Sequence, residues 1–239
     1  MIGLMTISLE ASAIKIAVAA NVSYAIDPLI KEFNLLYPDT KVQVILGSSG
    51  KLTAQIKHGA PYAIFMSANM HYPETLYKEK HALTKPVVYA QGRLAYFSPN
   101  IQDFTKGMRL LQDKEIDKIA IGNPKTAPYG IAGLEALKNA KVYESIKDKL
   151  VFGESISQTL SYAVRVTDMG LIAKSLLFSP KMAQYKEGVH WADVNASLYT
   201  PIQQGIVMLK KSEEIKKFYD FILGKKAKEI FRSYGYITP

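Results

Sequence analysis

Four turns of the same kind recur along the chain, each between a short apolar run and a run with helical spacing. They comprise residues 19–25 (AANVSYA), 46–52 (LGSSGKL), 122–131 (GNPKTAPYGI) and 153–160 (GESISQTL). A short apolar run rich in β-branched side chains indicates a buried strand, and apolar residues at helical spacing indicate a helix. Because strands and helices alternate in this way throughout, the sequence predicts an α/β protein built on parallel sheets.

Two long extended stretches, residues 86–99 and 196–209, lie far apart in the sequence. A chain that crosses twice between two α/β lobes would contain two such stretches. We therefore predict a first lobe formed by residues 14–89 and 206–239, and a second lobe formed by residues 90–205. Ligands of open α/β sheets bind outside the carboxyl ends of the strands, which is where the four turns lie.

The composition limits the kinds of site that the chain can form. Its 239 residues include no cysteine, so a disulfide framework and a thiolate metal site are both excluded. The four histidines are scattered without the spacing of metal ligands, which disfavours a metal cage. The formal net charge of +9 suggests an anionic partner: nucleic acid, a membrane surface or a small ligand.

The basic residues are not arranged as in a nucleic-acid-binding module, which would need a clustered basic face with interleaved aromatic residues. Lysines spread along the whole chain and are dense only in residues 209–217 (LKKSEEIKK) and 224–229 (GKKAKE). Both groups lie on amphipathic stretches, where a solvated helix face is the expected structure. We therefore expect no nucleic-acid partner.

The first residues of the chain have some features of an export signal. Residues 2–9 are mostly apolar, and residues 11–13 (ASA) have the small-x-small form of a signal-peptidase site, although a basic segment before them is missing. The alternative is a first strand that begins early. Because residues 14–20 (IKIAVAA) already make a complete strand, we predict that residues 1–13 are the remnant of a signal peptide and that the protein is exported.

Each of the four turns opens a helix, and helix starts attract anions. The first N–H groups of a helix have no partner within it, and the helix dipole is positive there. Several helix starts directed at one point form an anion site from neutral donors. The alternative is that the turns are simply helix caps, since Ser, Thr and Asn are favoured in that position.

The sequence GSSGK at residues 47–51 is similar to a phosphate-binding loop, but its spacing does not fit. Ile45 occupies the place of the first glycine and Leu52 the place of the Ser or Thr that would bind magnesium. No serine-hydrolase elbow of the form G-x-S-x-G is present either. A phosphotransfer enzyme would also need a metal-binding carboxylate and a general base near this loop, so we expect no catalytic activity.

Several segments together resemble one family along the chain from Ile14 to the C-terminus. They are IKIAVAANVSYAIDPLIKEF, LGSSGKLTAQIKHGAP, FMSAN, IGNPKTAPYGIAGLEAL, GLIAKS and KKFYDFILGKKAKEIFRSYGY. These segments are similar to the periplasmic molybdate-binding proteins of ABC transporters. The resemblance implies a type II periplasmic binding fold, whose two lobes are joined by two crossover strands and close on a tetrahedral oxyanion, molybdate or tungstate.

The same resemblance implies a transport role without catalysis. A member of this family would be a monomer without a cofactor that delivers its oxyanion to the inner-membrane permease of the transporter. The nearest alternative is a sulfate- or phosphate-binding transport protein. A phosphate-loop enzyme and a nucleic-acid-binding module are the alternatives of other classes.

The family's ligand positions correspond to Asn21, Ser49, Tyr129 and Ile156. Some members have a hydroxyl residue where Ala20 stands and a tyrosine where Ala173 stands, so this chain is similar to the subgroup whose tyrosine lies in the earlier turn. Ala63 stands where relatives commonly have aspartate, which affects local packing more than the ligand set.

This set of residues offers hydrogen-bond donors and no charge. Molybdate, tungstate and sulfate are fully deprotonated at neutral pH and only accept hydrogen bonds, whereas phosphate still carries a proton that it must donate. We therefore expect a site of this kind to refuse phosphate. Glu154 could overturn this expectation if its carboxylate entered the site, and we predict that it points away.

Overall fold

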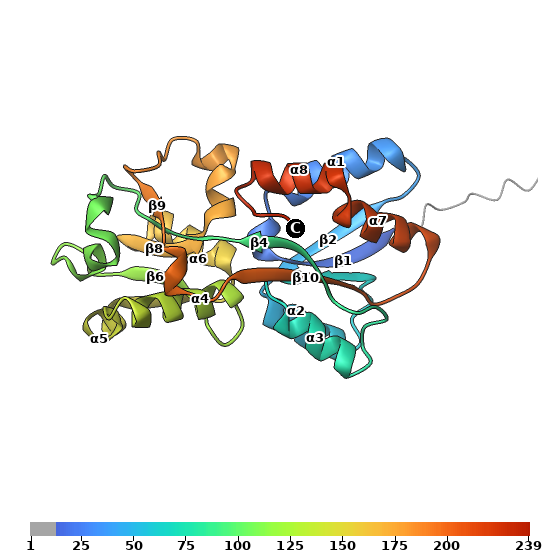
Figure 1. Cartoon of the computed structure of the whole chain (residues 1–239), viewed down its shortest axis with the longest axis horizontal. Helices are drawn as coiled ribbons and strands as arrows, with labels where there is room; N and C mark the ends of the chain where they lie inside the picture. The colour runs from blue at the N-terminus through green and yellow to red at the C-terminus, as the bar shows by residue number, and fades with distance from the viewer. Residues whose placement is uncertain (1–12) are drawn as a thin grey trace, which may run out of the picture.

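The computed structural model describes residues 13–239 and has two lobes that lie side by side (Figure 1). Each lobe is built around a five-stranded sheet with helices packed against it. The predicted segment 1–13 lies outside the described residues except for Ala13. No helix within residues 13–239 has the length and apolar character that a membrane span requires.

The sheet of the first lobe has the strand order β2-β1-β3-β10-β4. The strands are β1 (Ile14–Ala19), β2 (Val42–Gly47), β3 (Ile64–Met66), β4 (Val87–Gly92) and β10 (Ile202–Met208). Its helices are α1 (Ile26–Leu36), α2 (Ser49–Lys57), α3 (His71–Lys78), α7 (Glu213–Leu223) and α8 (Lys225–Ser233). The two C-terminal helices therefore return to the lobe in which the chain begins.

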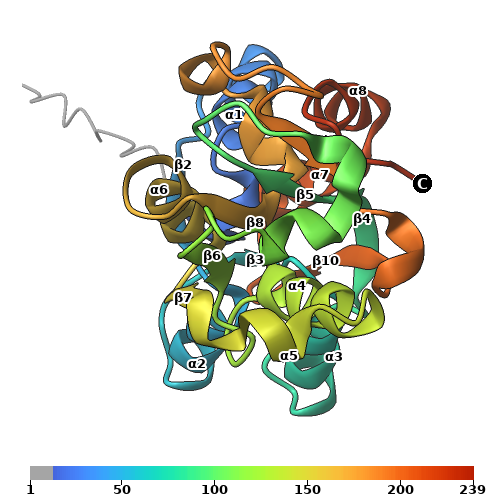
Figure 2. The same cartoon turned by 90° about the vertical axis from the view of Figure 1, so that its left-hand side faces the viewer.

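The sheet of the second lobe has the strand order β7-β6-β8-β5-β9. The strands are β5 (Leu94–Phe97), β6 (Ile119–Gly122), β7 (Leu150–Gly153), β8 (Met169–Ala173) and β9 (Trp191–Asp193). The α-helices are α4 (Pro128–Asn139), α5 (Tyr143–Ile146) and α6 (Ile156–Arg165). Helices α4 and α6 cover opposite faces of this sheet, as the view onto the second lobe shows (Figure 2).

The chain passes between the lobes along two extended segments, as predicted (Figure 1). Strand β4 ends at Gly92 in the first sheet, and β5 begins at Leu94 in the second. The chain returns through β10, which follows the short 3₁₀ helix Ala196–Leu198. The stretch 196–209 is thus extended only from its middle onward, and the prediction that all of it is extended is wrong at its start.

The prediction of parallel sheets is confirmed for the strands joined by helices and is wrong where β10 and β5 pair with their neighbours. Strand β10 is antiparallel to both β3 and β4, and β5 is antiparallel to both β8 and β9. A strand joined to its neighbour by a helix crossover runs parallel to it, as β1 does with β2 and β3. The crossing strands enter each sheet from the other lobe, without such a helix crossover, and their direction is therefore not restricted in this way.

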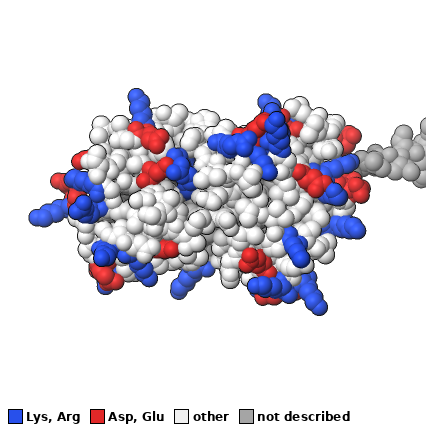
Figure 3. All heavy atoms as spheres, viewed as in Figure 1, with Lys and Arg blue, Asp and Glu red and all other residues white. Residues whose placement is uncertain are grey.

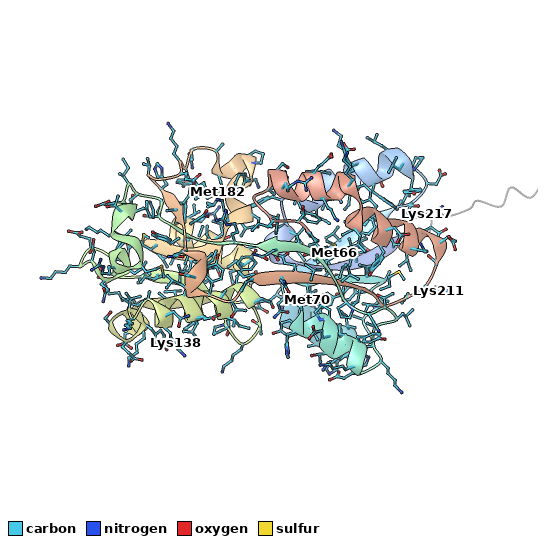
Figure 4. All side chains as sticks on the ribbon, in the orientation of Figure 1. Met66, Met70, Lys138, Met182, Lys211 and Lys217 are labelled. Carbon is cyan, nitrogen blue, oxygen red and sulfur yellow. The ribbon has the colours of Figure 1, made fainter. Side chains whose placement is uncertain are left out.

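Each lobe has its own hydrophobic core, which fixes the ends of its strands. Met66 lies in the core of the first lobe and Met182 in that of the second (Figure 4). Lys138, Lys211 and Lys217 in the same figure project from helices or loops at the surface. The face in Figure 3 shows basic and acidic side chains mixed over both lobes. The predicted solvated helix face is confirmed for Lys216 and Lys217 of α7, which are exposed, whereas Lys210 and Lys211 are exposed in the loop that precedes this helix.

Candidate functional site

A small cavity lies between the two lobes at the carboxyl ends of their strands. The empty space around it, which includes space open to solvent, is about 200 Å³. All four predicted turns contribute to its wall, and so do all four predicted ligand residues. The lining residues are Ala19, Ala20, Asn21, Gly47, Ser48, Ser49, Ala68, Ala127, Pro128, Tyr129 and Ile156. None of these lining side chains carries a charge, so the cavity is a neutral one.

Each turn takes up its position because a strand ends and a helix begins within a few residues. β1 leads directly into the 3₁₀ helix Ala20–Val22, which carries Asn21. Ser48 is extended at the start of α2, and Pro128 occupies the first turn of α4, where its missing N–H costs nothing. Ser155 caps α6, because its side chain accepts a hydrogen bond from the N–H of Gln158 at 3.3 Å.

Four backbone N–H groups at these helix starts remain available to a ligand. They belong to Asn21, Ser49, Tyr129 and Ile156, which stand in the first turn of their helices, where the helix supplies no acceptor. Within residues 13–239, none of these four N–H groups donates to another protein atom. Two of them come from each lobe, so a bound anion would join the lobes.

The hydroxyl of Ser49, a lining residue of the cavity, is free to donate to a ligand. Its Oγ is fully buried and accepts a hydrogen bond from the N–H of Ala68 at 2.9 Å. That bond occupies a lone pair of the oxygen and leaves its proton free, because no acceptor for it lies within the described part of the chain. Ser49 can thus offer an anion its N–H and its O–H together.

Ser48 is a second hydroxyl in the wall, and the sequence analysis did not select it. The residue is 4% exposed, and its Oγ has no hydrogen-bond partner among the described residues. A buried hydroxyl without a partner is unfavourable by about 1–3 kcal/mol unless a ligand or water satisfies it. Its position beside Ser49 in the GSSGK turn was the available signal.

Asn21 and Tyr129 also use their side chains within a buried polar network. The amide nitrogen Nδ2 of Asn21 donates to Gln204 Oε1 and to the hydroxyl of Tyr236, both at 2.9 Å. The hydroxyl of Tyr129 accepts from Gln204 Nε2 at 3.1 Å. Burial raises the pKa of Tyr129 well above its usual value, so this phenol stays protonated throughout the neutral range.

The lobes touch each other around the cavity, so the structure is a closed form. The N–H of Gly50 donates to the carbonyl of Thr126 at 2.9 Å, which joins the start of α2 to the turn before α4. The Ser157 hydroxyl donates to the carbonyl of Ala20, and the Ser175 hydroxyl to the carbonyl of Asn21, each at 2.9 Å. These contacts satisfy carbonyl oxygens that would otherwise repel an anion.

The prediction that Glu154 points away from the site is confirmed. Its carboxylate forms a salt bridge with Lys51 at 2.8 Å across the mouth of the cleft, where both side chains are more than half exposed. Glu154 is not among the residues that line the cavity. Within the described part of the chain, no carboxylate therefore lines the cavity.

Three further positions can be compared with their predictions. Ala20 lines the cavity, so its backbone reaches the site even though its side chain has no hydroxyl. Ala173 is not among the lining residues. Lys51 of the GSSGK sequence pairs with Glu154 at the cleft mouth.

Residues 13–239 contain no group of three or more His, Asp or Glu side chains that could hold a metal ion.

The chain is similar to known solute-binding proteins in its sequence and in its overall structure. The family model of bacterial extracellular solute-binding proteins matches residues 14–237. The molybdate-binding protein ModA of Azotobacter vinelandii is 32% identical over 241 residues, which cover 98% of this chain and 93% of that protein. ModA of Rhodobacter capsulatus is 35% identical over 247 residues, with coverages of 98% and 92%. The solved structure of the periplasmic molybdate-binding protein of A. vinelandii has a TM-score of 0.86 at 28% identity, and the match covers 95% of this chain and 99% of that one.

Proposed function

Because the chain belongs to the family of bacterial extracellular solute-binding proteins, we propose that it captures molybdate between its two lobes and delivers it to the permease of an ABC transporter. The relatives that support molybdate as the ligand match nearly the whole chain. The proposal includes tungstate, which has the same charge and tetrahedral shape. It also includes a periplasmic location, a monomeric state and the absence of catalysis.

One observation carries the proposal: the neutral cavity presents hydrogen-bond donors from both lobes and no charged side chain among its lining residues. The proposed ligands are the N–H groups of Asn21, Ser49, Tyr129 and Ile156 and the hydroxyl of Ser49. Helix starts stabilise an anion through oriented N–H groups without a full positive charge. Such a site holds the anion only while the lobes are closed, and it can release the anion when they open.

The test of this proposal is a comparison of four tetrahedral anions. Molybdate, tungstate, sulfate and phosphate are titrated into the protein by calorimetry, and the metal content of the protein after gel filtration is measured by elemental analysis. We expect molybdate and tungstate to bind tightly and phosphate to fail to compete. Phosphate must direct its proton at a donor, and a buried mismatch of this kind costs roughly 1–3 kcal/mol or more.

The other outcomes identify the alternatives. Preferential binding of sulfate would make the chain a sulfate-binding transport protein with the same donor set. Displacement of molybdate by phosphate at a comparable concentration would contradict the donor-only site. If none of the four anions binds, the proposal of an oxyanion carrier is wrong.

We predict that Ser49→Ala weakens molybdate binding by roughly ten- to a hundredfold. A hydrogen bond to a charged group contributes about 1.5–3 kcal/mol, which corresponds to this range of dissociation constants. The variant also leaves the N–H of Ala68 without its partner, so its melting temperature should fall as well. Ser67→Ala is the matched control, because Ser67 is equally buried but does not line the cavity. Equal affinities of the two variants would remove the Ser49 hydroxyl from the site.

We predict only a small effect for Glu154→Gln. The salt bridge with Lys51 is exposed to solvent, and exposed ion pairs contribute about 0–1 kcal/mol. Molybdate affinity should therefore change less than about fivefold at physiological salt. Titration of the variant at two salt concentrations measures this, and a loss comparable to that of Ser49→Ala would place the Glu154 carboxyl in the binding site itself.

A further inference from the structure

Gln204 contacts two proposed ligand residues from opposite lobes, although it does not itself line the cavity. It lies on the crossing strand β10 and is fully buried. The pairing of β10 with β4 shifts between Gln204 and Gly205, so that Tyr89 is the extra residue of a β-bulge in β4. Bulges redirect side chains, and here Tyr89 extends to Gln204.

The amide of Gln204 makes three hydrogen bonds within the described part of the chain, two through its oxygen and one through its nitrogen. Its Oε1 accepts from Asn21 Nδ2 at 2.9 Å and from the Tyr89 hydroxyl at 2.7 Å. Its Nε2 donates to the hydroxyl of Tyr129 at 3.1 Å. A single side chain on a crossing strand thus holds Asn21 of the first lobe and Tyr129 of the second.

This arrangement leaves one atom of Asn21 without a partner. Both protons of Nδ2 are used, one by Gln204 and the other by Tyr236. The remaining side-chain atom, Oδ1, is buried without a hydrogen-bond partner among the described residues. Asn21 lines the cavity, and Oδ1 is the one atom of its amide left free to meet a ligand there, where it would add an acceptor to a site otherwise built from donors.

In a second arrangement, with the heavy atoms in the same positions, the atom of the Asn21 amide without a partner is the donor and not the acceptor. The O and N atoms of an amide are nearly the same size, so turning both amides by half a turn keeps every heavy-atom distance. Gln204 Nε2 would then donate to Asn21 Oδ1 and to the Tyr89 hydroxyl, whose own proton can go to the carbonyl of Ser67 at 3.3 Å. The Tyr129 hydroxyl would donate to Gln204 Oε1.

In this second arrangement the atom of Asn21 without a protein partner is Nδ2, a donor. The Tyr236 hydroxyl, which now donates to the Asn21 carbonyl at 2.8 Å, would turn its proton toward Asn21 Oδ1. The carbonyl would keep its bond from Ser175. The two amides must turn together, because turning Asn21 alone would bring its Oδ1 within 2.9 Å of Gln204 Oε1, an unfavourable contact of two acceptors.

We propose that Gln204 is a positioning residue that sets the amide orientation of Asn21, and that a fully deprotonated oxyanion selects the arrangement in which Asn21 Nδ2 faces the cavity. This inference rests on the proposed function. It makes Gln204 a determinant of specificity that acts through Asn21. When Asn21 Nδ2 faces the cavity, the site favours molybdate. When Asn21 Oδ1 faces the cavity, the site would tolerate an anion that carries a proton.

The test compares Gln204→Glu with Gln204→Met at pH 8, where phosphate is a dianion that carries one proton. An ionised carboxylate at position 204 can only accept, and its three neighbours Asn21, Tyr89 and Tyr129 can all donate to it. It therefore fixes Asn21 Oδ1 toward the cavity. We expect molybdate affinity to fall at least tenfold. We also expect the affinity of phosphate relative to molybdate to rise about tenfold, as measured by displacement of molybdate by phosphate.

Gln204→Met is the control for volume, because methionine neither donates nor accepts here and leaves the Asn21 amide free to turn. Both anions should lose affinity equally in this variant, so the relative affinity should stay close to that of the wild type. The negative charge that Gln204→Glu introduces repels the two dianions alike, and a repeat at pH 9, where the phosphate monoanion is scarce, separates its effect from that of the Asn21 amide. A purely structural role of Gln204 predicts the same ratio in both variants, and that result would overturn the inference.

A spectroscopic measurement on the unmodified chain covers the case in which Gln204→Glu does not fold. In ¹H–¹⁵N spectra, molybdate should shift the side-chain NH₂ signals of Asn21 and Gln204 together. Unchanged Gln204 signals at saturating molybdate would contradict the coupled turning. Failure of the wild type to bind molybdate would instead refute the proposed function, so the two failures can be told apart.

Discussion

Gly130→Ala is expected to abolish molybdate binding, whereas Gly133→Ala on the same helix should leave it intact. Gly130 lies in the first turn of α4, directly after Tyr129. A Cβ atom there would overlap the carbonyl oxygen of Gly122 and lie 2.5 Å from its carbonyl carbon. These are backbone atoms of β6 and cannot move aside, so the start of α4 must shift and carry the Tyr129 N–H out of position.

The expected loss of affinity exceeds about a hundredfold, because binding groups must be held within roughly 0.5 Å of their working geometry. Overpacking of this kind also lowers the free energy of unfolding by about 1–3 kcal/mol. In Gly133→Ala the new Cβ meets only the side-chain ends of Ile121, at 3.1 and 3.3 Å, and of Leu171, at 3.5 Å. Calorimetry and thermal melts compare the two variants. Binding by Gly130→Ala within about tenfold of the control would show that the start of α4 does not form the site.

The turns that form the site could be predicted from the sequence because each is a local feature. Gly47, Ser48 and Ser49 follow an apolar strand directly, and this chemistry marks a helix start wherever it occurs. The resemblance to molybdate-binding proteins then selected one residue in each turn. The structure brings those residues into one cavity, and their role as ligands stays a prediction.

The polar network behind the site could not be predicted, because it joins distant parts of the chain. Asn21 bonds to Gln204, which is 183 residues away, and to Tyr236, which is 215 residues away. Nothing in the local sequence distinguishes Gln204 from the neighbouring Gln203, which is exposed. Only the tertiary fold, with its bulge at Tyr89, decides which of the two side chains is buried.

The exact division of the chain into lobes also stays a prediction. The sequence placed the junctions after residues 89 and 205, whereas the first sheet includes β4 as far as Gly92 and β10 from Ile202. Arg93 alone separates β4 from β5, so no loop marks where one lobe ends and the other begins. This is why an extended stretch can be recognised in the sequence more readily than the hinge point within it.

Gly92→Ala is expected to weaken molybdate binding on the order of a hundredfold by opposing closure of the lobes. Gly92 ends β4 at the crossing, and a Cβ atom there would overlap the hydroxyl of Tyr129 from the other lobe and lie 2.6 Å from Gln204 Nε2. Overpacking against two buried groups corresponds to the upper end of the usual range, about 3 kcal/mol, or roughly a hundredfold in the dissociation constant.

The larger part of the expected damage falls on the closed form, because opening the lobes carries Tyr129 away from Gly92, whereas Gln204 lies on the strand paired with β4 and stays close to Gly92 in both forms. The melting temperature of the ligand-free variant should therefore change much less than its affinity, and small-angle scattering should detect less compaction by molybdate than in the wild type. The double variant Gly92→Ala/Tyr129→Phe removes the overlapping oxygen and should bind more tightly than the two separate losses predict, since residues in contact are not additive. Strict additivity of the two losses would show that the methyl group introduced at position 92 does not act through the Tyr129 hydroxyl.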